Sequence, residues 1–509
     1  MPAIQRIDSS TRPVALYGST GTRVIEKRAT GALPPHTLMR RAGEATGQLA
    51  LALAPHARTV WVAAGPGNNG GDGLEAASWL QQQGKRCVVT LSGDPSKAPA
   101  DAKDAFERAQ AAGVSFKSEA PKLTSHDLAI DGLLGIGGSR APQDRLADDV
   151  RRLNALACPV LAIDAPSGLN ADTGQPYGAD CVVATHTLTL LTLKPGLFTG
   201  AGRDHAGQVW YDPLGVDATP EHAPDAWLRG RPPRIDGVAR RHAAHKGTFG
   251  DVAVVGGAAG MTGAAILAAR AAHAAGAGRV FVALLRDPRH ATAEIDVVRP
   301  ELMFRSDWCE SPPAVLMQTT VVCGCGGGDA IRGPLPRLIS LAARLVLDAD
   351  ALNAIAGDRG LRSALLARRT RRLQTVLTPH PLEAARLLDG RTTEVQGDRI
   401  GAARELADRY GCVVVLKGSG SVIAMPDTVP VINATGNAAL ASAGTGDVLA
   451  GWIGGRWAQV AEPATSAAVL EMTASAVAEH GAGAEPLAPG ALRANDLIET
   501  LYARERARS

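Results

Sequence analysis

Two glycine-rich loops in opposite halves of this sequence combine small residues with amide and carboxylate side chains. The first reads Gly-Pro-Gly-Asn-Asn-Gly-Gly-Asp-Gly over residues 65–73. The second comprises Asn-Ala-Thr-Gly-Asn at 433–437 and Ala-Gly-Thr-Gly-Asp at 443–447. Each lies where a strand-like or small-residue stretch passes into a helix-like one, and glycine lets backbone N–H groups approach a phosphate. The sequence therefore predicts two nucleotide-handling sites, and two activities on one polypeptide.

The first loop places two consecutive amides, Asn68 and Asn69, ahead of Asp72. Amide oxygens suit a monovalent cation or a ligand amide, and the N-terminus of the following helix offers unpaired N–H groups to an anion. The alternative interpretation is structural: a tight turn in which an Asn or Asp side chain caps the helix.

Carboxylates also follow two later strands. Asp131 opens the run Asp-Gly-Leu-Leu-Gly-Ile-Gly-Gly at 131–138, and Asp164 opens Asp-Ala-Pro-Ser-Gly at 164–168. Ligands of open parallel sheets bind at the carboxyl ends of strands, so both carboxylates are expected near the first loop. Either could instead be an exposed cap, but three such loops at three consecutive strand ends favour a site.

The second loop ends in Asp447, directly after glycine N–H groups that can form an anion hole for a phosphate. A carboxylate beside such a hole can deprotonate a hydroxyl. The structural alternative is an Asp cap after a glycine-rich turn.

Three polar segments lie upstream of this loop. Lys417-Gly-Ser-Gly-Ser421 ends an apolar strand and is a candidate nucleotide contact. His380, in Thr-Pro-His-Pro-Leu-Glu at 378–383, follows another strand; a lone His is usually structural, but this one stands at a strand's carboxyl end. His-Lys-Gly at 245–247 precedes the first strand of this half, and Gly256-Gly257 follows that strand.

Strand and helix signals alternate in both halves, which indicates parallel sheets covered on both faces. In the first half, strands are expected at 60–64, 86–91, 127–131, 159–164 and 181–191, with helices at 38–53, 72–83, 100–112 and 141–157. In the second half, strands are expected at 251–255, 279–285, 320–325, 344–348, 375–377 and 412–416, with helices at 262–275, 447–458 and 464–480.

The chain is expected to form two domains, because 509 residues exceed one ordinary core. Clustered prolines and charges around 218–235 predict a connection between them, since proline cannot supply ladder hydrogen bonds. The expected boundaries are a first domain at 1–225, a linker at 226–240 and a second domain at 241–509.

Composition narrows the class of protein. A net charge of +3 implies no nucleic-acid or membrane partner, and small-molecule substrates are expected. Seven Cys at irregular spacing are no disulfide framework, and Cys-Gly-Cys at 323–325 lacks the second ligand pair of a zinc site. No signal peptide or membrane-length apolar run is visible, so a cytoplasmic location is expected. Few aromatics (4%) and 57 Gly favour close packing of helices and sheets.

The motifs of the first half together resemble the NAD(P)H-hydrate epimerase domain over roughly residues 20–215. The resemblance implies a Rossmann-like three-layer αβα sandwich that interconverts the R and S epimers of NAD(P)H hydrate. It implies a potassium site at Asn69, Asp131 and Ser167, and makes Asp164 the acid–base candidate, with Lys194 as a second charged group nearby. The implied substrate contacts are Asn68, Asn69, Gly70, Gly71, Asp72, Gly135, Ile136, Gly137, Gly138, Ser139, Arg140, Ala141 and Asp164.

The motifs of the second half resemble the ADP- or ATP-dependent NAD(P)H-hydrate dehydratase over roughly residues 240–505. That family implies a ribokinase-like α/β domain, and the whole chain is similar to the bifunctional NAD(P)H-hydrate repair enzymes. Asp447 is the implied base, and Ala264, Gly326, His380 and Asp447 the implied hydrate contacts. The implied adenine-nucleotide contacts are Lys417, Gly418, Ser419, Gly420, Ser421, Asn437, Gly444, Thr445 and Gly446.

Two segments depart from the family patterns. Ile136 stands where the epimerases more often have Thr, which removes a hydroxyl from that loop. Cys-Gly-Cys-Gly-Gly-Gly at 323–328 replaces Gly-Pro-Gly-Leu-Gly, which leaves the register around Gly326 open.

The expected chemistry is repair of a hydrated nicotinamide ring. Asp447 would deprotonate the ring hydroxyl for attack on a nucleotide phosphoryl group, with magnesium and glycine N–H groups stabilising the charge. Two rivals are a small-molecule kinase in the second half and a non-catalytic nucleotide sensor in the first. The choice between ADP and ATP, and between NADH and NADPH hydrate, stays open, and the helix at 38–53 offers a surface for a homo-oligomer.

Overall fold

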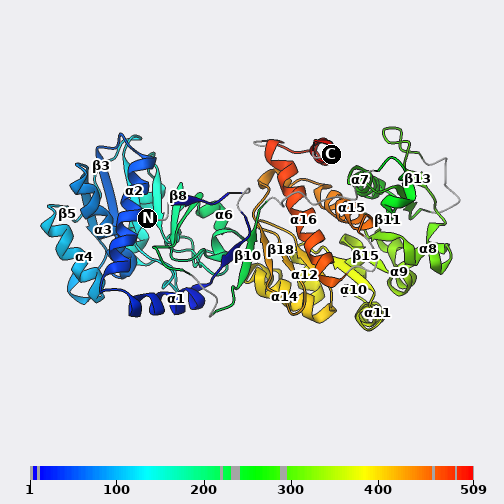
Figure 1. Ribbon diagram of the computed structural model, residues 1–509, viewed down its shortest axis with the longest axis horizontal. Coiled ribbons are helices and arrows are strands. Elements are labelled where there is room, and N and C mark those ends of the chain that lie inside the picture. Colours follow the sequence, from blue (N-terminus) through cyan, green and yellow to red (C-terminus); the bar gives the residue numbers. More distant parts are fainter. Residues whose placement is uncertain are drawn as a thin grey trace. The chain divides into compact units, whose positions relative to one another are not determined.

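The computed structural model describes residues 4–8, 12–217, 222–230, 241–286, 295–460, 465–487 and 490–507. The chain divides into two compact units, Met1–Leu228 and Arg229–Ser509 (Figure 1). Of the stretch expected to link them, Ala226–Arg229 forms strand β10, and residues 231–240 lie outside the described residues.

The first unit is built on a sheet whose strands are parallel except at one edge, where β1 runs antiparallel to β9. Its order is β1 (Gln5–Arg6), β9 (Gln208–Asp212), β8 (His186–Leu190), β7 (Val160–Ile163), β6 (Leu128–Gly132), β3 (Thr59–Ala64), β4 (Arg86–Leu91) and β5 (Ser115–Lys117). A further strand, β2 (Val14–Leu16), pairs antiparallel with β10.

Alternate residues of β3 face two different cores. Val62 packs with one apolar cluster, which α2, α3 and α4 help to form, while Trp61 packs with the other, beside α5. The sheet is therefore covered on both faces, and the expected three-layer αβα sandwich is confirmed. The helices of this unit are α1 (Ser19–Ala32), α2 (Thr37–Leu53), α3 (Asn68–Gln82), α4 (Ala100–Ala111), α5 (Asp144–Asn154), α6 (Gly202–His205) and the short η1 (Pro95–Lys97) and η2 (Pro195–Leu197).

Two elements of this unit are shorter than the sequence predicts, and several others were not predicted. The strand expected at 181–191 starts only at His186, because the backbone N–H of Val182 bonds the carbonyl of Ser167, outside the sheet ladder. The helix expected at 141–157 is α5, shorter at both ends. Helix α1 and strands β5 and β9 were not expected from the sequence.

The second unit contains a sheet that is parallel from β13 to β17 and antiparallel beyond. Its order is β13 (Met303–Phe304), β12 (Arg279–Leu284), β11 (Asp251–Gly256), β14 (Thr320–Cys323), β15 (Arg344–Leu347), β16 (Gln374–Leu377), β17 (Val413–Leu416), β18 (Val422–Ala424) and β19 (Val431–Asn433). The backbone N–H of Ala434 bonds the carbonyl of Arg229.

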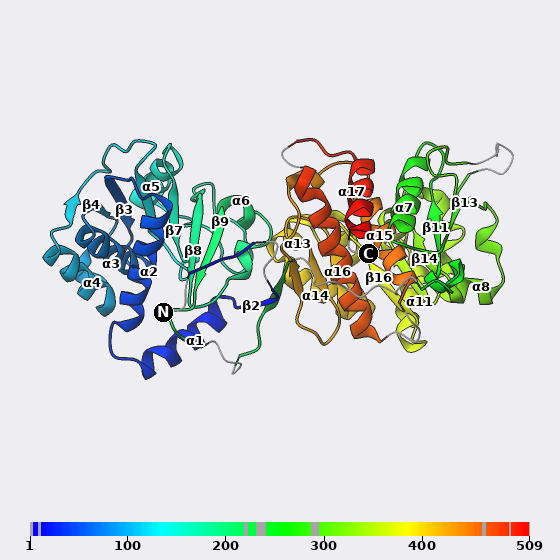
Figure 2. The same ribbon diagram turned by 45° about the horizontal axis from the view of Figure 1, so that its top comes forward.

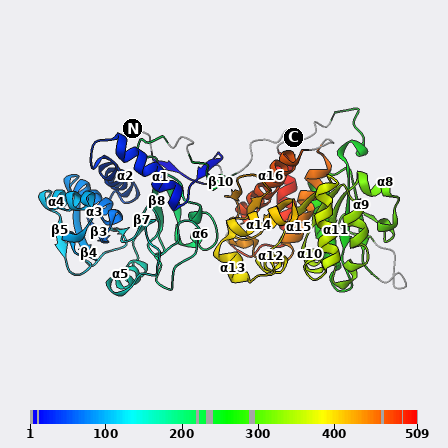
Figure 3. The ribbon, with the colours of Figure 1, turned by 90° about the horizontal axis from the view of Figure 1, so that it is seen from below.

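Helices α7, α15, α16 and α17 cover one face of this sheet (Figure 2), and α10, α12 and α13 gather on the other side (Figure 3). The first group is α7 (Thr262–Ala274), α15 (Thr445–Ala458), α16 (Ser466–Ala484) and α17 (Ala494–Arg506). The others are α8 (Pro313–Gln318), α9 (Leu335–Leu341), α10 (Ala349–Ala356), α11 (Arg359–Thr370), α12 (Pro381–Leu388), α13 (Thr392–Gly397), α14 (Arg399–Tyr410), η3 (Lys246–Phe249), η5 (Trp308–Glu310), η6 (Asp329–Arg332), η7 (Ala438–Leu440) and η8 (Glu485–Leu487).

Small residues allow α15 and α7 to touch. A methyl group on Gly451 would lie 2.0 Å from the carbonyl oxygen of Ala268, and one on Gly455 would lie 2.4 Å from that of Ala272. Gly454 faces the sheet, where a methyl would lie 2.4 Å from Val322. This contact accounts for the small residues on the facing surfaces of α7 and α15. The N-terminus of α15 lies at the carboxyl ends of β14 and β15, because Asp447 adjoins Cys325 and Asp348.

The seven cysteines, Cys87, Cys158, Cys181, Cys309, Cys323, Cys325 and Cys412, are free thiols, and all except Cys309 are buried. Within the described ranges, no helix combines the length and the apolar character needed to cross a bilayer.

Candidate active sites

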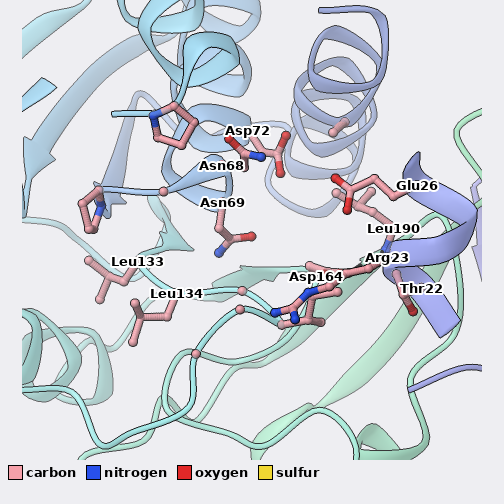
Figure 4. A pocket seen from close by; sticks show the side chains of 18 of the residues that line it. Thr22, Arg23, Glu26, Asn68, Asn69, Asp72, Leu133, Leu134, Asp164 and Leu190 are labelled. Carbon is pink, nitrogen blue, oxygen red and sulfur yellow. Dashed lines mark hydrogen bonds between the residues drawn. The ribbon is translucent and has the colours of Figure 1, made fainter. Parts of the chain in front are cut away.

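A pocket of about 860 Å³ opens at the carboxyl ends of β3, β6 and β7 in the first unit (Figure 4). Its wall includes Asn68, Asn69, Asp72 and Asp164, together with the loop 135–141. Gly70 and Gly71 do not line it; their backbones pack against Gly65 and Met39. Apart from these two glycines, the structure brings together at one pocket all residues expected to contact the substrate of this unit.

Glycine is required where the first loop meets the loop after β6. A methyl on Gly65 would lie 1.7 Å from the carbonyl oxygen of Leu133, and one on Gly70 would lie 2.0 Å from that of Gly65. Asn68 then begins α3, so its N-terminal N–H groups lie at the pocket.

Asp131 joins the loops after β6 and β7 from beneath the pocket. Its Oδ1 accepts hydrogen bonds from Ser167 Oγ (2.6 Å) and from the N–H of Leu133 (3.2 Å), and its Oδ2 accepts one from the N–H of Ser167 (2.8 Å). Burial raises the pKa of Asp131 to about 6, although the bonds from Ser167 and Leu133 favour the carboxylate. Neither Asp131 nor Ser167 lines the pocket itself.

Asn69 lies over the same loop. A methyl on Gly135 would lie 3.2 Å from Asn69 Oδ1, and Asn69 Nδ2 is buried without a hydrogen-bond partner. Buried amides are almost always paired, so an orphaned one indicates that a ligand belongs beside it.

Asp164 is held at the pocket by a buried lysine. Lys194, whose side chain is 1% exposed, forms an ion pair with Asp164 and donates to the carbonyl of Leu190 at 2.6 Å. Asp164 has a φ of 67°, an uncommon value for a non-glycine residue. The backbone strain and the charge pair together aim this carboxylate at the ligand space.

Helix α1 supplies pocket residues that the sequence did not reveal. Thr22, Arg23, Glu26 and Thr30 line the wall, and Figure 4 shows Glu26 pointing towards Asp72. Burial, followed by the charge of Asp164, raises the pKa of Glu26. The pKa of Asp72 lies well above its usual range for the same two reasons. Because α1 precedes the first expected strand, no strand-end rule identified these residues.

The second candidate site surrounds the N-terminus of α15. Gly444 adopts a left-handed conformation (φ 86°) and Asp447 lies in the first turn of the helix. Side-chain atoms of Cys325, Asp348 and Asp447 lie within 4.8 Å of one another. Burial, then the neighbouring Asp348, raises the pKa of Asp447 to about 6. This group can therefore accept a proton near neutral pH.

Lys417 lies in this cluster and is paired with Asp348. Its Nζ is 2.6 Å from Asp348 Oδ1, which also accepts a hydrogen bond from Thr378 Oγ1 at 2.8 Å. Burial lowers the pKa of Lys417, but Asp348 and Glu383 outweigh it and raise the pKa above its ordinary value. A methyl on Gly446 would lie 3.4 Å from the Lys417 Nζ, so the ammonium adjoins the glycine-rich turn.

The remaining expected contacts fall into two groups. Gly326 (φ 59°) adjoins Ala264: a methyl on Gly326 would lie 2.9 Å from the Ala264 side chain. These two residues therefore lie together, and the N–H of Ala258 bonds the carbonyl of Gly326 at 2.7 Å. His380 caps α12: its Nδ1 accepts from the N–H of Leu382 at 3.1 Å, and burial lowers its pKa.

Some of the residues expected to bind the nucleotide make contacts within the protein. Asn437 accepts from the N–H of Ala439 and donates to the carbonyl of Ala484. Gly418 has a φ of 137° and adjoins the guanidinium of Arg399. The segment 245–247 lies at the amino ends of β11 and β12, away from the carboxyl ends that bear the site, and a methyl on Gly278 would lie 1.7 Å from the Lys246 carbonyl oxygen.

Sequence reasoning did not identify Asp348, Thr378 or Glu383 as members of this site. Asp348 follows β15 directly, so the strand-end rule that singled out Asp131 and Asp164 would have found it. Glu383 lies inside the expected segment 378–383, and burial raises its pKa to about 7.

Comparison with known proteins covers both units. The family described as "YjeF-related protein N-terminus" matches residues 35–196, and the family described as "NAD(P)H-hydrate dehydratase" matches residues 252–502. The bifunctional NAD(P)H-hydrate repair enzyme Nnr of Escherichia coli (strain K12) is 37% identical over 487 residues, covering 92% of this chain and 88% of that protein. The enzyme of the same name from Coxiella burnetii is 36% identical over 92% of this chain and 95% of its own length.

A solved structure also resembles the chain. The ADP/ATP-dependent NAD(P)H-hydrate dehydratase of Bacillus subtilis, co-crystallised with ATP and Mg²⁺, is 28% identical, with a TM-score of 0.43, over 53% of this chain and 94% of that one.

Proposed function

Because this chain belongs to the family of bifunctional NAD(P)H-hydrate repair enzymes, we propose that it epimerises R and S NAD(P)H hydrate and dehydrates the S epimer to NAD(P)H at the expense of ADP or ATP. The observation that carries this function is the coverage of the relatives: one curated bifunctional enzyme is 37% identical over 92% of the chain, across both units. Each unit supplies its own carboxylate for the chemistry, Asp164 in the first and Asp447 in the second.

In the dehydratase unit, Asp447 takes the proton of the ring hydroxyl while that oxygen attacks the terminal phosphoryl group of the nucleotide. The bond from that phosphorus to the bridging oxygen breaks, and the nucleotide leaves with one phosphate fewer. The phosphorylated oxygen is a much better leaving group than hydroxide. Electrons of the ring nitrogen then expel phosphate, and the neighbouring ring carbon loses a proton to complete the double bond. The N–H groups of the turn at 443–446 and the Lys417 ammonium stabilise the charge that develops on the phosphoryl oxygens.

Magnesium enters this proposal with the nucleotide. Mg²⁺ is usually bound through substrate phosphates and one or two carboxylates. The cluster of Cys325, Asp348 and Asp447 includes a soft thiol and a carboxylate already paired with Lys417, so it does not form a dedicated magnesium cage. We therefore treat the metal–nucleotide complex as the co-substrate.

Potassium fits beside the first loop. Asn69 can supply its amide oxygen Oδ1, which lies over Gly135, and the Asp131 carboxylate retains lone pairs beyond its three hydrogen bonds. Asn69, Asp131 and Ser167 would hold the ion, which would supply a fixed positive charge under the pocket. Oxygen ligands of this kind suit a hard cation. Titration with KCl against choline chloride, with epimerisation as the readout, tests this assignment.

The test of the whole proposal uses purified protein with a mixture of R and S NADH hydrate, ADP and magnesium, following the absorbance of regenerated NADH. Recovery of both epimers is expected. Recovery of the S fraction alone would contradict the epimerase assignment. No recovery with ADP or with ATP, together with a stable phosphorylated product from a small alcohol, would favour a ribokinase-like kinase.

Two further expectations stay predictions. The first is a cytoplasmic location, which cell fractionation tests. Light scattering on purified protein tests for a homo-oligomer, and substitution of the exposed residues of α2, Arg40, Gln48 and Ala52, tests whether that helix forms its interface.

A further inference from the structure

One face of α1 runs along the pocket of the first unit. The residues that line the pocket, Thr22, Glu26 and Thr30, are each four positions apart, which is the spacing of one helix face. The helix is fixed there because Ile25 and Ala29 are buried and Thr22 Oγ1 lies 2.7 Å from Thr192 Oγ1. Glu26 is therefore positioned by the fold, and Figure 4 shows its carboxyl group directed into the pocket.

Among the acidic side chains that line the pocket, Glu26 and Asp164 reach the ligand space from different elements. Asp164 directly follows β7, at the carboxyl end of that strand, whereas Glu26 comes from α1 (Figure 4). Asp164 is already paired with the buried ammonium of Lys194. This ion pair fixes the position of the Asp164 carboxylate at the pocket.

We propose that Glu26 is a second catalytic residue of the epimerase, serving one face of the hydrated ring while Asp164 serves the other. The inference rests on the proposed epimerase function and deepens it. An epimerase must remove a group from one face and return it to the opposite face. Two acid–base groups on two sides of the ligand meet that requirement.

The inversion balances without any further reactant. Glu26 donates its proton to the ring hydroxyl, the C–O bond breaks, and the lone pair of the ring nitrogen forms a C=N double bond, releasing water. A water molecule adds to the same carbon from the opposite face, returning the electron pair to nitrogen. Asp164 accepts the proton of that water. The pair holds one proton throughout, and the reverse reaction exchanges the two roles.

The charges around Glu26 are consistent with this role. Burial raises its pKa, as does the negative charge of Asp164, while Lys194 and Arg23 oppose the rise and Asp101 adds to it. Asp72, which Glu26 faces in Figure 4, adds a further carboxyl group at the same wall. Close carboxyl groups disfavour full ionisation, so this environment favours the proton-donating form of Glu26 relative to an isolated glutamate.

The test compares Glu26→Gln with Lys27→Gln, a control on the same helix whose side chain faces solvent. Conversion of purified R epimer to S is followed without nucleotide, after subtraction of the protein-free rate. We expect Glu26→Gln to lower the epimerisation rate by about 100-fold, the low end of what a general acid contributes. Glu26→Asp should recover part of it, and Lys27→Gln should behave as wild type. Urea unfolding of the same samples checks that the first unit is folded, because dehydration reports on the second unit alone.

Two readouts separate catalysis from a structural role. In wild type, epimerisation should decline on the alkaline side as the shared proton is lost, and this decline should vanish in Glu26→Gln. In H₂¹⁸O, each inversion should introduce one ¹⁸O into the hydroxyl. The inference would be overturned if the wild type epimerises and Glu26→Gln retains a rate within threefold of it. Inversion without oxygen exchange would also overturn it. Failure of wild type to epimerise would instead overturn the proposed function.

Discussion

Replacement of Asp447 by Asn separates the two activities of the chain. Asn has the same shape and keeps a hydrogen-bonding oxygen in the first turn of α15, but it cannot accept the proton of the ring hydroxyl. General-base catalysis contributes about 10²–10⁴-fold. At about 1.36 kcal/mol per tenfold, the dehydration barrier should rise by about 2.7–5.4 kcal/mol. Epimerisation should be unchanged, because Asp447 lies in the other unit.

The structure also predicts the pH dependence of the wild-type reaction. Burial and the Asp348 charge raise the pKa of Asp447 to about 6. The base must be ionised, so kcat/KM for dehydration should be level above that pKa and fall about tenfold per pH unit below it. An unperturbed Asp would keep its rate down to about pH 4.

The assay uses purified S epimer with ADP and magnesium, and follows the absorbance of NADH between pH 5 and 8. The matched control is Asp427→Asn, because Asp427 is exposed and its left-handed backbone (φ 58°) suits Asn equally well. A variant Asp447→Asn that retains dehydration within a factor of a few, with an unchanged pH profile, would refute the assignment of the base.

Three further predictions concern the supporting structure. Asp131→Ala leaves the buried backbone N–H groups of Ser167 and Leu133 unpaired, at a cost of about 1–3 kcal/mol for each donor. Urea unfolding should show the first unit less stable by several kcal/mol. Epimerisation should be abolished, while dehydration persists. Lys417→Met leaves the buried Asp348 carboxylate unpaired; we expect a loss of about 3–5 kcal/mol in the second unit and no dehydration, with epimerisation as the internal control. Gly451→Ala should destabilise the contact of α15 with α7 by about 1–3 kcal/mol, because its methyl would lie 2.0 Å from the Ala268 carbonyl oxygen. Gly263→Ala, which has open space around it in α7, should stabilise that helix by up to about 1 kcal/mol. Equal shifts of the melting temperature in the two variants would contradict this account.

Local patterns in the sequence determined the strands and turns that border the two sites. Short apolar runs followed by glycine and a polar side chain identified β3, β6 and β7 and the residues that follow them, because strand periodicity and turn chemistry are properties of adjacent residues. The same reasoning located the turn before α15. It also indicated the α/β class of both units, because alternating strand and helix signals leave parallel sheets as the common solution.

Contacts between distant segments could not be determined in this way. Glu26 reaches the first pocket only because α1 folds across the strand ends, and Asp348 reaches Asp447 only because β15 lies beside the strand that leads to Cys325. The pairing of Lys417 with Asp348 joins residues 69 positions apart. The shifted pKa values follow from the same packing, since burial and neighbouring charge exist only in the folded chain. The sequence by itself determined which groups stand at the strand ends, whereas the tertiary structure decided which of them meet and in what charge state, because those depend on long-range packing.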